Sequence, residues 1–167
     1  MANTAILRYK VEPAIRAVLE TEFAQRFTSQ VLALPGGAVR EFDAVSDDRS
    51  VVVSIKTSSG LTSGGNIPGG KIDGCIADLY YLSLLDSPVR RLVLTNPQFH
   101  EIFTKRMAGA LPQGVEVKLV PLPADLQAEV DDVIRRASEE INRGKAAQEV
   151  AASIEEEVEA ASGSLPS

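Results

Sequence analysis

The chain has 167 residues, one cysteine and one histidine, and its formal net charge is −6. This length suits one domain with a substantial core. A single cysteine excludes an internal disulfide and a zinc cage built from cysteines, and no apolar run approaches the length that crosses a membrane. Because the first residues show no long apolar segment behind a basic start, we expect no secretory signal and a cytoplasmic protein.

The negative charge is concentrated towards the end of the chain. Residues 123–167 hold eleven acidic and four basic residues, whereas residues 1–122 hold twelve acidic and thirteen basic ones. The body of the chain is therefore close to neutral. The sign of the net charge of the whole chain therefore says little about what the body binds, and it does not exclude nucleic acid as a partner.

Residues 12–27 have the spacing of an amphipathic helix, with Pro13 at a position that the first turn tolerates. Its apolar stripe consists of Ile15, Val18, Leu19 and Phe23. Glu22 falls on the same stripe. An acid in a core-facing position needs a reason: it reaches solvent at the helix end, pairs with an arginine, or belongs to a site.

Alternation and turn residues predict strands after this helix, and a polar turn at residues 46–50 makes a hairpin of the second and third. A Gly- and Ser-rich segment then leads to a second helix at residues 71–86. The predicted buried face of that helix consists of Ile72, Cys75, Ile76, Leu79 and Leu82. The remaining predicted elements are strands at 30–34, 38–45, 50–56, 90–95 and 115–120 and helices at 96–110 and 124–143.

This order predicts an α/β fold. We expect a core at residues 1–123, a packed helix at 124–144 that Gly144 ends, and an acidic, mobile tail at 145–167. The final residues, 162–167, are expected to be disordered because they are small and polar.

The hairpin carries charge on a face that is otherwise apolar. Ser54 and Lys56 share one face of the third strand because side chains alternate along a strand. The hairpin brings Asp43 opposite this end. A carboxylate and an ammonium in such a place cost desolvation free energy unless they are paired or bind something.

Helix, three strands, helix, strand, with Asp43 on the second strand and Ser54-Ile55-Lys56 on the third, resembles the PD-(D/E)XK nuclease superfamily. The resemblance covers about residues 12–95. It implies a restriction endonuclease-like core, α-β-β-β-α-β, with a central mixed sheet flanked by helices. It also implies a DNA endonuclease that depends on Mg²⁺ or Mn²⁺, in which Asp43 binds the metal and Lys56 is the catalytic lysine.

Phosphodiester hydrolysis explains this pattern of residues. It needs a hard divalent cation held by carboxylates, and a neighbouring lysine can orient the attacking water and offset charge on the phosphate. Members of the family often place a glutamate on the first helix, and Glu22 fits that position as a catalytic and metal-binding acid. Lys71, at the start of the second helix, could contact a DNA phosphate together with Ser54.

Ser54 stands where the family has an acid. Some restriction endonucleases with serine here supply the acid from the following helix, which in this chain means Asp73 or Asp78. We expect the second acid to be Glu22, then Asp73, then Asp78, in that order. Without such an acid, the alternative is a non-catalytic module of the same fold that binds DNA or protein. Restriction-type enzymes commonly dimerise to cut both strands, so a homodimer stays open.

A second motif competes for the chemistry. Residues 65–71 satisfy G-x-x-x-x-G-K, the pattern of a phosphate loop. However, Ile72 follows the lysine in place of a hydroxyl residue, and the preceding strand ends at Lys56 rather than at the loop. A phosphate-loop nucleotide binder is therefore the least favoured of the three hypotheses.

Overall fold

The structure is a computed structural model that describes residues 5, 7–58, 60–62 and 64–162. Its elements in chain order are η1 (Leu7–Val11), α1 (Glu12–Phe23), β1 (Phe27–Ala33), β2 (Val39–Ser46), β3 (Val51–Lys56), α2 (Gly69–Ser83), β4 (Val89–Leu94), α3 (Pro97–Arg106), β5 (Val115–Leu119) and α4 (Ala124–Ser162). The predicted α/β class is confirmed. All but one of the residues expected to be disordered at the C-terminus lie outside the described part of the chain.

The five strands form one mixed sheet in the order β1-β2-β3-β4-β5. β1 pairs with β2, and β2 with β3, in antiparallel orientation, which short turns permit. β3, β4 and β5 are parallel, and α2 and α3 provide the two crossover connections. Since both crossovers advance in the same direction across the sheet, a common handedness places both helices on the same face.

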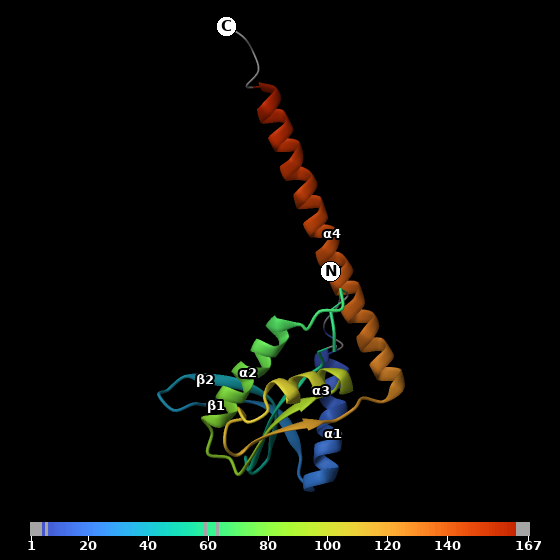
Figure 1. Cartoon of the computed structure of the whole chain (residues 1–167). Helices are drawn as coiled ribbons and strands as arrows, with labels where there is room; N and C mark the ends of the chain where they lie inside the picture. The colour runs from blue at the N-terminus through green and yellow to red at the C-terminus, as the bar shows by residue number, and fades with distance from the viewer. Residues whose placement is uncertain (1–4, 6, 59, 63, 163–167) are drawn as a thin grey trace.

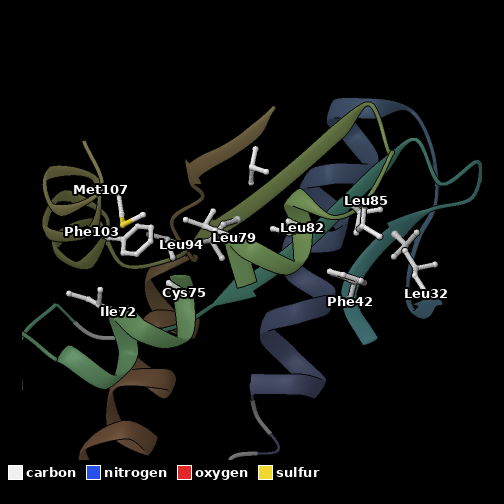
Figure 2. Packing of buried hydrophobic residues seen from close by; sticks show 14 of the residues in the cluster. Leu32, Phe42, Ile72, Cys75, Leu79, Leu82, Leu85, Leu94, Phe103 and Met107 are labelled. Carbon is white, nitrogen blue, oxygen red and sulfur yellow. The ribbon is translucent and has the colours of Figure 1, made fainter. Parts of the chain in front are cut away.

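The two faces of the sheet therefore have different covers (Figure 1). α2 and α3 pack on one face, and Figure 2 shows the apolar side chains that fill this layer, among them Phe42, Leu79 and Phe103. On the other face, η1, α1 and the beginning of α4 pack against Val53, Val93 and their neighbours. β3, in the middle, is covered on both sides, which explains its nearly continuous apolar sequence.

Two details of the predicted helix faces are wrong. Val18 is exposed, because the buried stripe runs from Val11 at the end of η1 through Ile15 and Leu19 of α1, at intervals of four residues. On α2, Ile76 is exposed and Asp78 is buried instead. A helix buries the side chains that face its sheet, and ion pairing allows a carboxylate to be among them.

Gly144 does not end the last helix. α4 continues through it to Ser162 and extends away from the body of the protein (Figure 1). Val130 is fully buried against the sheet layer, and Leu126 and Ile134 pack beside it, whereas Ile141 is exposed. One glycine costs a helix only about 1 kcal/mol, which flanking helix-forming residues offset. Among the described residues, no helix is both long and apolar enough to cross a membrane.

Candidate active site at the fork between β2 and β3

β2 and β3 diverge at their centre. Of the described strand residues, only the pairs Ala44–Val53 and Val45–Val52 join the two strands. Beyond them, β2 pairs with β1 and β3 pairs with β4. The pairing of β1 with β2 shifts register between Thr28 and Gln30, opposite this point, so the ladder is irregular where β2 leaves β3. We call the point of divergence the fork.

The tight turn before β3 fixes the register of this hairpin. The Asp48 carboxylate accepts hydrogen bonds from the Ser46 hydroxyl and from both the hydroxyl and the backbone N–H of Ser50. These bonds lower the pKa of Asp48 well below its usual value. Because the turn is held locally, the sequence was sufficient to predict that Asp43 would lie opposite the end of β3.

Asp43 occupies the fork itself. Its Oδ2 accepts a hydrogen bond of 2.7 Å from the backbone N–H of Ile55. The side chain thus replaces the carbonyl group that a paired strand would offer to this N–H. Burial raises the pKa of Asp43, although the Ile55 hydrogen bond and the charge of Lys56 act in the opposite direction. An ionised carboxylate in this position would gain free energy from a neighbouring cation.

Lys56 lies at the end of β3, where its Nζ is 2.9 Å from Oδ2 of Asp78. Arg40, on β2, holds the other oxygen of the same carboxylate, with Nη2 2.5 Å from Oδ1. Asp78 itself has a side chain that is only 3% exposed. A buried carboxylate of α2 therefore fixes two cations that come from the two sides of the fork.

Glu12, at the first position of α1, brings a second acid towards Asp43. Burial raises the pKa of Glu12, and the negative charge of Asp43 raises it further. Arg16 lies between them: its Nη2 is 2.7 Å from Glu12, and its Nε donates a 2.8 Å hydrogen bond to the backbone carbonyl of Asp43. Glu12 was not among the predicted site residues, because an acid in the first turn of a helix is already favoured by the helix dipole.

Glu22 is far from the fork, contrary to the expectation that it serves as the catalytic and metal-binding acid of α1. It follows Glu12 by ten residues, which corresponds to about 15 Å along a helix. Its carboxylate pairs with Arg91 and Lys118 on β4 and β5, and the hydrogen bond from Lys118 is the main reason for its lowered pKa. Its place on the inward stripe therefore reflects an ion pair.

The expected order of the other acids is also reversed. Asp73 is exposed on α2, whereas Asp78, the last acid in the expected order, forms an ion pair with Lys56. Five residues along a helix correspond to about 140° of rotation, so only one of the two can face the sheet. Ser54 is buried on the face that also carries Lys56.

Lys71 lies in the first turn of α2 and is exposed. β3 ends at Lys56 and α2 begins at Gly69. The segment between them is longer than a single turn, so β3 does not pass directly into a phosphate loop. Cys75, beside Asp78 and Lys56, is fully buried, and this burial raises the pKa of its thiol to about 11. The thiol is therefore protonated at neutral pH and is not a nucleophile.

In the part of the chain that the structure describes, no three His, Cys, Asp or Glu side chains are grouped as a metal site would require. Glu12 and Asp43 form an acidic pair at the fork, whereas Asp78 is already engaged by two cations. Two carboxylates provide the hard oxygen ligands that Mg²⁺ prefers, and this cation commonly completes its shell with water and phosphate oxygens. Comparisons with protein-family models, with curated proteins and with solved structures found no match to this chain.

Proposed function

We propose that the protein is a Mg²⁺-dependent DNA endonuclease of the restriction endonuclease-like type, with Mn²⁺ as an alternative cofactor. One observation carries the proposal: the half-buried carboxylate of Asp43 lies at the fork with the charge of Lys56 nearby, so that an acid and an ammonium are brought together where two strands separate. The mixed sheet between helices is compatible with the α-β-β-β-α-β core of that family.

Each side chain at the fork has a role in this proposal. Asp43 and Glu12 would hold the metal, which when bound polarises a phosphate oxygen and makes a water molecule more acidic. Lys56 orients the attacking water and offsets negative charge that develops on the phosphate. Asp78 holds the Lys56 ammonium in place, and Arg16 holds Glu12 beside Asp43.

The test is nicking of supercoiled plasmid DNA in the presence of Mg²⁺ or Mn²⁺, with EDTA as the metal-free reaction. We expect Asp43→Asn and Lys56→Ala to abolish nicking. Lys105→Ala is the matched control, because Lys105 is an exposed lysine whose ion pair with Glu101 lies within α3. If either the Asp43 or the Lys56 variant nicks plasmid as the wild type does and has a normal melting temperature, that residue is not catalytic.

A second candidate is a non-catalytic module that binds DNA. It is favoured by Ser54 in place of an acid and by the engagement of Asp78 with Arg40 and Lys56, which leaves few ligands for a metal. This protein would bind a labelled DNA duplex without nicking plasmid. A nucleotide binder, the least favoured hypothesis, would instead show a rise in melting temperature with ATP.

A further inference from the structure

Arg40 is held more elaborately than neutralisation of a carboxylate requires. Its Nη2 contacts Asp78, and its guanidinium carbon lies 4.0 Å from the ring centre of Tyr81. Asp78 and Tyr81 are three residues apart on α2 and so lie on one face of the helix. One fixes an edge of the guanidinium group and the other covers a flat side, which leaves little rotational freedom.

The pairing with Asp78 uses only part of what Arg40 offers. An arginine can bind a carboxylate with two parallel hydrogen bonds, yet here Lys56 takes the second oxygen. Within the described residues, Arg40 donates only through Nη2, and its Nε is buried with no hydrogen-bond partner. Its side chain is nevertheless 32% exposed. The guanidinium group thus keeps donors that no residue of the described chain uses.

The position of Arg40 relates it to the fork. It precedes Asp43 by three residues on β2, which corresponds to about 10 Å along a strand. Lys56, tied to the same carboxylate, has a side chain that is 35% exposed. Two partly exposed cations are therefore held at a fixed separation beside the proposed cleavage site.

We propose that Arg40 contacts a phosphate of the DNA backbone adjacent to the one that is cleaved, and that Asp78 and Tyr81 position it for this contact. This inference rests on the proposed function for the location of the cleaved phosphate. Arginine suits the role because its planar group presents several donors to phosphate oxygens. Arg40 is thereby a substrate-binding residue, and Asp78 and Tyr81 are positioning residues.

Binding of a short fluorescein-labelled DNA duplex, measured by anisotropy with Ca²⁺ in place of Mg²⁺, tests the contact. We expect Arg40→Ala to raise Kd about tenfold, and to reduce the slope of log Kd against log salt by about one. Arg40→Lys keeps a positive charge beside Asp78, and its Kd should lie between those of the wild type and Arg40→Ala. The matched control is Arg8→Ala, because Arg8 is an exposed arginine that pairs with Glu41, the residue next to Arg40.

A double-mutant cycle separates positioning from general stabilisation. Tyr81→Leu should weaken DNA binding in the wild-type background and have no further effect on Kd in the Arg40→Ala background. Melting temperatures are measured in parallel. Since Arg40→Ala leaves Asp78 with one partner fewer, Arg40→Lys provides the comparison should the alanine variant fold poorly.

The inference is overturned if Arg40→Lys and Arg40→Ala bind the duplex with the wild-type Kd, or if Arg8→Ala weakens binding as much. Failure of the Arg40 contact can be distinguished from failure of the proposed endonuclease function. Plasmid nicking by wild type with an unchanged Kd for Arg40→Ala would remove the Arg40 contact alone. Arg40-dependent DNA binding with no nicking would instead remove the endonuclease and retain the contact.

Discussion

The carboxylate of Asp43 accepts a 2.7 Å hydrogen bond from the backbone N–H of Ile55, at the point where β2 and β3 separate. This single bond has two consequences. It satisfies a backbone donor that would otherwise be left without its strand partner. It also holds a carboxylate in a half-buried place, where the charge is costly. Structure and candidate chemistry therefore share one side chain, and substitutions at this position can separate them.

Asp43→Asn should abolish nicking while preserving or raising stability. The amide oxygen can still accept the Ile55 N–H, and no charge is desolvated. The pKa of Asp43 is raised by burial, so its contribution to stability is fully present below the ordinary value of 3.8 and is lost as pH rises through the folded pKa. In melting experiments, the advantage of asparagine should therefore grow as pH rises above the ordinary value of 3.8 and through the folded pKa of Asp43. A variant that melts several degrees lower and still nicks DNA would show that Asp43 is structural.

Glu12→Gln and Glu22→Gln form a matched pair on one helix. We expect Glu12→Gln to weaken Mn²⁺ binding, measured by calorimetry, because Glu12 is the acid beside Asp43. Glu22→Gln should leave Mn²⁺ binding unchanged and lower stability by up to about 1 kcal/mol. The pKa of Glu22 is lowered, so this contribution is present above its ordinary value and disappears as pH falls through the folded pKa. Reversed effects on Mn²⁺ binding would restore Glu22 as the acid of the site.

Ser54→Glu should strengthen metal binding. Ser54 precedes Lys56 by two residues on the same strand face, and a carboxylate there would add a third acid near Asp43. Since Ser54 is buried, the larger side chain will also cost stability, and Ser54→Gln controls for its size. Tighter Mn²⁺ binding by the glutamate variant alone is the expected result. Equal affinities for Mn²⁺ in both variants would mean that this face is not a metal site.

Arg91 forms an ion pair near the C-terminal end of α1, the end of this helix that is remote from the fork. Its side chain is 7% exposed and pairs with Glu22 and Glu116. We expect Arg91→Met to lower the free energy of unfolding by about 2 kcal/mol, because Glu116 loses this partner and Glu22 keeps Lys118 but loses the more buried of its two cations. Nicking per folded molecule should not change. Arg135→Met is the control: Arg135 also pairs with two acids, but its side chain is 59% exposed, so the change in the free energy of unfolding should be much smaller.

Removal of residues 145–167 should leave the melting transition intact. The described contacts of α4 with the sheet layer are made by its beginning, around Val130. Val130→Ala should instead cost about 2 kcal/mol, because it leaves a cavity.

The same truncation also tests the acidic segment, which could cover a DNA-binding face as a mimic of phosphate charge. Because α4 extends away from the body, we expect DNA affinity to stay the same at each salt concentration (Figure 1). A marked increase at low salt would show that these acids compete with DNA.

Periodicity and turn chemistry were sufficient to predict the order of the helices and strands. Alternation along β3 and the polar turn at residues 46–50 also predicted that Asp43 meets the end of this strand, because a hairpin is fixed by local interactions. The resemblance to a nuclease family stays a prediction. The lengths of α1 and α4 were wrong, since helix ends depend on packing and a single glycine does not stop a long helix.

Only the tertiary structure decided which other charges join Asp43 and Lys56. The stripe of α1 contains an acid at Glu22, but the helix begins at the fork and ends near Arg91, so Glu12 is the acid that reaches it. Asp78 faces the sheet because two cations compensate its burial. Neither placement follows from spacing, because spacing gives the face of a helix, whereas the end of the helix that meets a site depends on how it docks.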